Sequence, residues 1–271
     1  MAHLTEAVGA PVQRVYAIGD IHGRFDLFRE MIYKIEQDQS TRPPASTRII
    51  LLGDIVDRGP DTARLVQGCM ALTASTDRFV VLKGNHEEMM VEALRGNRST
   101  YEAWLGFGGR ETLLSWGVDP EMIAGPPSTK HLRNAATLVG HETLEWLATL
   151  PLIYRHETYL FVHAGIRPGV PVDRQQSDDL LWIKDDFLSS TADHGYTIVH
   201  GHSAEAEVVV HENRIGLDTG AYRTGRLSAI GIENGKSWML NTDPEADARY
   251  HISRDAAGSG NDTFSRMETQ Q

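Results

Sequence analysis

The chain has 271 residues, and its hydrophobic fraction of 41% is enough for one large domain with a buried core. The formal charge of −11 argues against a nucleic-acid-binding surface, and no run of 18 apolar residues is present to span a membrane. The single cysteine, Cys69, excludes an internal disulfide and fits a reducing compartment. Residues 1–11 lack the pattern of a secretory signal, so we expect a loose arm there and a cytoplasmic protein.

Three apolar runs in the first third of the chain predict buried strands at 12–19, 48–53 and 79–84. Helical spacing of apolar residues predicts a helix at 25–37, and a proline at position 60 suits the first turn of a second helix that ends near residue 74. Strands therefore alternate with helices, as in α/β proteins. Each strand is followed by a glycine-rich block, and open α/β sheets bind ligands at that edge.

Residues 88–150 show helical periodicity and no clear strand, which predicts a small helical insert. The second half returns to strands, with hairpin turns at 212–213 and 234–235. The strands are expected at 152–156, 158–163, 197–200, 207–211, 227–232 and 237–240. The polar segment 243–271 is expected to be a flexible tail, so that the domain spans residues 12–242.

The blocks at the strand ends carry side chains that bind metal ions. Asp20 and His22 are two residues apart, so on an extended strand end they would point the same way and reach one metal. Asp54, at the end of the next strand, is the natural carboxylate bridge between two ions. Either aspartate alone could instead cap the helix that follows it. The combination with other ligands in matching places favours a two-metal site that acts on phosphate esters.

Further ligands follow later in the chain. Asn85 offers a neutral amide oxygen, and His163 and His202 would complete a second metal site. A histidine after an apolar strand, such as His163, can also be a buried core residue. This set of nitrogen and oxygen ligands suits Mn, Fe or Zn rather than Ca.

The sequence blocks resemble the phosphoprotein phosphatase family of calcineurin-like metallophosphoesterases, in particular its bacterial and phage branch. The resemblance covers about residues 14–232 and rests on GDIHG at 19–23, GDIVDRG at 53–59, GNHE at 84–87, FVHAG at 161–165, Leu181-Trp182 and VHGHS at 199–203. It implies a two-layer β-sandwich flanked by helices, with a dinuclear site on one edge. It also implies two divalent ions, of which Mn is the first expectation, with the ligands Asp20, His22 and Asp54 for the first ion and Asp54, Asn85, His163 and His202 for the second.

The resemblance also implies how the reaction proceeds, by in-line attack of a metal-bridging hydroxide on the phosphorus. His86 would be the general acid, and Asp57 would orient it. Arg58 would bind the substrate phosphate with its guanidinium fork, and Asn85 would lie beside the same phosphate. The family usually has a second arginine clamp where this chain has Lys184, which keeps the charge but loses the fork.

These residues favour a serine/threonine protein phosphatase that acts on phosphorylated proteins or peptides, with phosphotyrosine as a further substrate class. A dinucleoside polyphosphate hydrolase on the same scaffold is the alternative. That branch lacks the aspartate equivalent to Asp57 and has aspartate where this chain has Glu87. Ala204 lies where many other metallophosphoesterases have a further histidine ligand, which favours the phosphoprotein branch over the wider superfamily. A non-catalytic phosphate-binding scaffold would require a missing ligand or acid, and none is missing.

Overall fold

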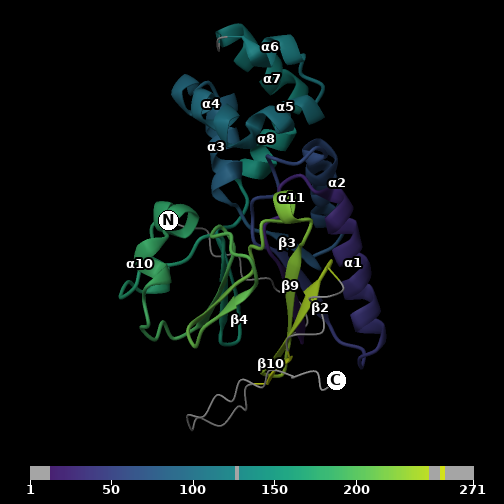
Figure 1. Cartoon of the computed structure of the whole chain (residues 1–271), viewed down its shortest axis with the longest axis vertical. Coiled ribbons are helices and arrows are strands. Elements are labelled where there is room, and N and C mark those ends of the chain that lie inside the picture. Colours follow the sequence, from purple (N-terminus) through teal and green to yellow (C-terminus); the bar gives the residue numbers. More distant parts are fainter. Residues whose placement is uncertain (1–12, 126–127, 244–250, 254–271) are drawn as a thin grey trace.

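Two β-sheets stacked face to face form the body of the protein, with helices on both outer faces and a cluster of helices at one end (Figure 1). A computed structural model gives the structure over residues 13–125, 128–243 and 251–253, the last three as backbone only. The predicted two-layer β-sandwich flanked by helices is confirmed. The predicted arm at 1–11 lies outside the described residues.

The first sheet has the strand order β11-β10-β9-β1-β2-β3. β1, β2 and β3 are parallel, whereas β9, β10 and β11 join them in antiparallel pairs. The strands are β1 (Arg14–Ile18), β2 (Thr47–Leu51), β3 (Phe79–Val81), β9 (Ser228–Glu233), β10 (Lys236–Asn241) and β11 (His251–Ser253).

The second sheet has the order β4-β5-β6-β8-β7, in which β5, β6 and β8 are parallel. Its strands are β4 (Ile153–His156), β5 (Tyr159–Val162), β6 (Thr197–His200), β7 (Val209–Val210) and β8 (Arg214–Gly216). The predicted strand at 207–211 is wrong in extent, because only two of its residues pair with β8. The three-residue β8 itself was missed, since so short a strand has no readable period.

Both faces of the central strands are buried, which explains their continuous apolar sequences. In β1, Val15 and Ala17 face the second sheet, whereas Tyr16 and Ile18 face the helices outside. The outer face of the second sheet is covered in turn by Leu180 and Phe187 of its flanking helices. Alternate residues therefore enter different cores, as the two-residue period of a strand requires.

The helices on the outer faces are α1 (Phe25–Ser40) and α2 (Thr62–Ser75) on the first sheet, and α9 (Ser177–Trp182) and α10 (Asp185–Leu188) on the second. A short helix, α11 (Ala221–Thr224), and a 3₁₀ turn at Val172–Arg174 complete the body. The predicted helix from residue 60 begins two residues later, after a turn.

The helical insert packs against α2 and shares its core, so it is continuous with the body. It consists of α3 (Asn85–Leu94), α4 (Arg98–Trp104), a π-helical turn (Leu105–Gly109), α5 (Arg110–Ser115), α6 (Pro120–Ala124), α7 (Thr129–Val139) and α8 (His141–Ala148). These helices lie together above the sheets in Figure 1. The insert is helical as predicted, and its first helix begins inside the GNHE block.

The expected tail from residue 243 lies mostly outside the described residues. Its backbone at 251–253 nevertheless pairs with β10 as β11, so this part of the tail belongs to the first sheet. The polar composition of the segment gave no signal for an added edge strand.

Candidate metal centre and active site

Asp54 lies between two groups of ligand-capable side chains at the edge of the sandwich. One group combines it with His22 and His86, and the other with His163 and His202. Its Oδ2 is 3.6 Å from Nε2 of His22, and its Oδ1 is 3.4 Å from Nε2 of His163. The two carboxylate oxygens therefore face different groups, which is the geometry of a bridging carboxylate.

The second group contains acceptor atoms that face one another. Nδ1 of His163 lies 2.9 Å from the carbonyl of Leu52 and donates to it, so Nε2 keeps its lone pair. That Nε2 lies 2.8 Å from Oδ1 of Asn85, and Nδ1 of His202 lies 3.0 Å from the same oxygen. Burial, with a smaller contribution from the neighbouring ring of His163, lowers the pKa of His202 to about 3, which leaves that ring neutral. Several lone pairs directed at one point are relieved by a cation, so this group fits a divalent metal ion.

The first group is built around two imidazoles. Nδ1 of His22 donates to the carbonyl of Val56 at 2.8 Å, which leaves Nε2 as a lone pair. Burial lowers the pKa of His22 to about 3, so the ring is neutral and suited to bind a metal. Nη1 of Arg58 lies 2.6 Å from this Nε2, and Nη2 lies 2.8 Å from Nε2 of His86. The guanidinium of Arg58 is therefore at the site, where the resemblance places the phosphate clamp.

Asp20 holds the loop that carries His202 through hydrogen bonds to its backbone. Both of its carboxylate oxygens accept the backbone N–H of His202, at 3.2 and 3.0 Å. Burial, Asp218 and Asp54 raise the pKa of Asp20 well above its ordinary value. A cation bound nearby would offset the repulsion between these buried carboxylates. Asp20 was expected beside His22 and Asp54 in the first group. The structure places it beside His202 instead, and His86 completes the first group.

Left-handed backbone marks the site. The loops that carry the ligands place five non-glycine residues at positive φ, namely His22 (47°), Asp54 (49°), Asp57 (72°), Arg58 (67°) and His202 (62°). Such conformations cost free energy and are found where the surrounding structure holds functional residues in place. The expectation that His22 lies on an extended strand end is therefore wrong. β1 ends at Ile18, and His22 reaches the site through a turn.

His86 and Asp57 form a buried pair. Nδ1 of His86 donates to Oδ2 of Asp57 at 2.6 Å. Burial acts to lower the pKa of His86, but the carboxylates of Asp54 and Asp57 outweigh it, and the pKa lies above its ordinary value. A histidine held by a carboxylate at one nitrogen can carry a proton at the other, which is what a general acid requires.

Glu87 is a structural carboxylate that the sequence did not single out for a role at the site. Its side chain is fully buried and accepts four backbone N–H groups, those of Gly84, Asp54, Ile55 and Val56. It thereby joins the start of α3 to the loop that carries Asp54. Gly84 is required beside it, because a Cβ there would overlap the carboxylate of Asp54.

The remaining candidates lie at the rim. Lys184 is exposed before α10, and its charge is among those that act on His202. Trp182, 45% exposed, packs edge-on against His202 with ring centroids 6.3 Å apart. On the other side, the ring of Tyr222 lies 4.8 Å beneath the guanidinium of Arg58. One aromatic ring, that of Trp182, therefore contacts the second ligand group, and another, that of Tyr222, contacts the first.

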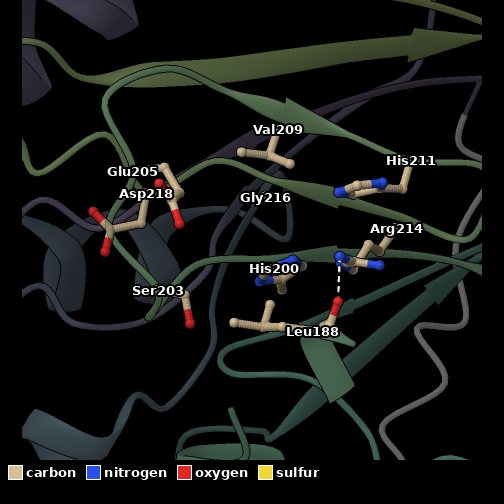
Figure 2. Close-up of a pocket in the computed structure, with 9 residues that line it drawn as sticks. All are labelled: Leu188, His200, Ser203, Glu205, Val209, His211, Arg214, Gly216 and Asp218. Carbon is tan, nitrogen blue, oxygen red and sulfur yellow. Dashed lines mark hydrogen bonds between the residues drawn. The ribbon is translucent and has the colours of Figure 1, made fainter. Parts of the chain in front are cut away.

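A cavity of about 130 Å³ opens beside the loop that carries His202, and none of the expected metal ligands lines it (Figure 2). Figure 2 shows Glu205 and Asp218 toward one end and His211 and Arg214 toward the other. Nδ1 of His200, in its wall, lies 3.0 Å from the carbonyl of Gly201. His200 therefore contributes to the wall of this cavity and to the support of the loop.

The sequence profile of the calcineurin-like phosphoesterases matches residues 13–225. The chain belongs to this family. Calcineurin-like phosphoesterases use a dinuclear metal site, and the two ligand groups that share Asp54 fit one. Among the described residues, no helix of this phosphoesterase is long and apolar enough to cross a bilayer.

Relatives of this phosphoesterase differ in the substrates that their names give. Serine/threonine-protein phosphatase 1 of Salmonella typhimurium is 28% identical over 82% of this chain and 93% of its own length. A symmetrical bis(5'-nucleosyl)-tetraphosphatase of Aromatoleum aromaticum is 32% identical over 57% of this chain and 45% of its own, so the chain spans about half the length of the tetraphosphatases that it matches. A solved structure provisionally assigned as a diadenosine tetraphosphatase shares the fold, with a TM-score of 0.57, 22% identity, and coverage of 86% and 96% of the two chains.

Proposed function

We propose that this phosphoesterase is a serine/threonine protein phosphatase that removes phosphate from phosphorylated proteins or peptides, with phosphotyrosine as a further substrate class. The hydrogen bond from His86 to Asp57 carries the proposal. The alkoxide of a serine or threonine is a poor leaving group, so its departure depends on a proton supplied by an acid. The phosphatase relative, which this chain matches over most of both lengths, supports the same substrate class.

The residues of the chain divide the work. Asp54, His22 and Asp20 would hold one ion, while Asp54, Asn85, His163 and His202 would hold the other. Two divalent ions there, Mn in the first instance with Fe or Zn as alternatives, would supply Lewis acidity and activate water.

A different set of side chains would contact the substrate. Arg58, with support from Asn85 and Lys184, would take the phosphate oxygens as its guanidinium turns from the imidazole nitrogens to the substrate. Nε2 of His86 would give its proton to the leaving oxygen, and Asp57 would keep the ring in the required orientation.

A dinucleoside polyphosphate hydrolase is the second candidate, because tetraphosphatases are among the relatives. Its leaving group is a nucleotide phosphate, which leaves readily as an anion and has less need of an acid. The presence of Asp57 with a buried hydrogen bond to His86 therefore favours the phosphatase. Glu87, in the position where the tetraphosphatase branch carries aspartate, favours it as well.

A rate assay on metal-depleted protein, with and without added Mn, tests the proposal. The substrates are a phosphothreonine peptide, a phosphotyrosine peptide and diadenosine tetraphosphate. We expect Mn-dependent phosphate release from the phosphothreonine peptide. Activity on the dinucleotide alone would contradict the proposal and favour a dinucleoside polyphosphate hydrolase. Metal binding without activity on any of the three substrates would favour a non-catalytic phosphate-binding scaffold.

The role of His86 is tested by His86→Asn, with the exposed His141→Asn as its control. We expect the first variant to lose about 10²- to 10⁴-fold in turnover of the phosphothreonine peptide while its metal content stays the same. The control should behave like the unaltered protein. Unchanged turnover in His86→Asn would remove the assigned acid.

A further inference from the structure

The helical insert reaches the buried pair of Asp57 and His86. Nε1 of Trp104, in α4, donates to both oxygens of Asp57 at 3.0 and 2.8 Å. The hydroxyl of Thr112, in α5, donates to Oδ1 at 2.6 Å and accepts the backbone N–H of Asp57 at 2.9 Å. The side chains of Trp104, Thr112 and Asp57 are all fully buried, so water does not compete for these bonds.

The same part of the insert also fixes the next residue of the loop. The carbonyl of Gly108, in the π-helical turn between α4 and α5, accepts the backbone N–H of Arg58 at 3.1 Å. Gly108 has φ of 112°, and a Cβ there would lie 2.6 Å from Cγ of Arg58. The chain is kinked at Gly108, between α4 and α5, and this close approach at a positive φ requires glycine.

Each oxygen of Asp57 has a defined role in this arrangement. Oδ2 accepts a hydrogen bond from Nδ1 of His86, and Oδ1 accepts one from the hydroxyl of Thr112, while the indole N–H of Trp104 donates to both oxygens. Burial raises the pKa of Asp57, and hydrogen bonds from His86, Thr112 and Trp104 act against that rise. Without the two donors from the insert, only the hydrogen bond with His86 would orient the side chain of Asp57, and its buried Oδ1 would lose both of its side-chain donors.

We propose that Trp104 and Thr112 are positioning residues that hold Asp57, and through it His86, in the orientation of a general acid. The insert then belongs to the machinery of the site, besides shaping its cleft. The kinetic consequence rests on the proposed function, whereas the hydrogen-bond geometry does not. The effect must be selective, because a proton is needed for an alkoxide leaving group and hardly for an acidic phenol.

The test compares Thr112→Val and Trp104→Phe with matched controls from the same insert. Thr143 is a buried threonine of α8, and Trp146 of α8 packs on the same core. For Thr112→Val and Trp104→Phe we expect about 10-fold or greater loss of kcat on a phosphothreonine peptide, and less than about 3-fold on p-nitrophenyl phosphate. Thr112→Ser, which keeps the hydroxyl, should restore most of the loss.

The controls Thr143→Val and Trp146→Phe should change both rates alike and only slightly. Metal content, measured by elemental analysis, should be the same in all variants. Equal losses on the two substrates in Thr112→Val and Trp104→Phe, or failure of Thr112→Ser to restore turnover, would show a merely structural role and overturn the proposal.

A second readout is independent of activity. The indole N–H resonance of Trp104, assigned as the signal lost in Trp104→Phe, should lie downfield because it donates to a carboxylate. It should move in Asp57→Asn and stay in place in Thr143→Val. If the protein hydrolyses no phosphate ester but the resonance moves, the proposed function fails and the positioning geometry stands. A resonance that does not respond to Asp57→Asn would overturn the positioning itself.

Discussion

Replacement of Glu87 by glutamine should be among the most damaging conservative changes in the chain. Oε1 accepts the N–H groups of Ile55 and Val56 at 2.9 and 3.1 Å, and Oε2 accepts those of Asp54 and Gly84 at 2.8 and 2.7 Å. In Glu87→Gln one of these oxygens becomes an amide NH₂. Whichever way the amide turns, two backbone donors then face a donor instead of an acceptor.

The magnitude follows from those two donors. A buried N–H group that loses its acceptor costs about 1–3 kcal/mol, so two of them cost about 2–6 kcal/mol. Burial and the charge of Asp54 raise the pKa of Glu87 to about 7, so a neutral amide relieves part of the cost of the buried charge. We expect a net decrease of about 2–4 kcal/mol in the free energy of unfolding at pH 8, where the carboxylate is ionised.

Urea denaturation at pH 8 measures this decrease, provided that the m value is unchanged. Glu88→Gln is the matched control, since Glu88 is the next residue in α3 and its partly exposed side chain pairs with Lys83 at 3.0 Å. The control should lose less than about 1 kcal/mol, as exposed ion pairs do. A loss in Glu87→Gln no larger than that of the control would refute the reasoning from the four N–H groups.

Further predictions concern the backbone and the metal ions. Gly108→Ala should destabilise the protein by about 2 kcal/mol or more in the same assay, because a Cβ would press on Arg58. Gly117→Ala, at φ of 79° with open space around it, should cost only about 1 kcal/mol, and equal costs would refute the steric argument. His163→Ala should lower the bound Mn from two ions to at most one by elemental analysis, whereas the exposed His141→Ala should retain both. Chelation of the ions should lower the Tm of the unaltered protein, because the ligands of the second group come from both sheets, and an unchanged Tm would contradict this.

The sequence predicted the first strands well, because burial on both faces leaves a local pattern. β1 and β2 are apolar on both faces, so they are continuous apolar runs, and the motif blocks lie directly after them. The parallel pairing of β1, β2 and β3 then brings those blocks to one edge without further information.

The contacts that the sequence could not predict are those between distant segments. Trp104 and Thr112 lie 47 and 55 residues after Asp57, inside helices whose periodicity reports only their own packing. The turn that brings His22 into the site depends on a left-handed backbone at this residue. The local sequence does not predict that conformation for a particular histidine. Glu87 reads as an ordinary helix-start glutamate, and its four hydrogen bonds appear only when the loops meet.

The bond from the backbone N–H of His202 to the carboxylate of Asp20 joins residues 182 positions apart. During synthesis on the ribosome, Asp20, His22, Asp54 and Asn85 emerge long before His163 and His202. The early segment by itself therefore cannot offer the complete pair of ligand groups, and closing so long a loop has an entropic cost that only the packed sandwich recovers. We therefore expect the second ligand group to form only after His163 and His202 have packed against the first sheet, so that metal binding there would follow folding.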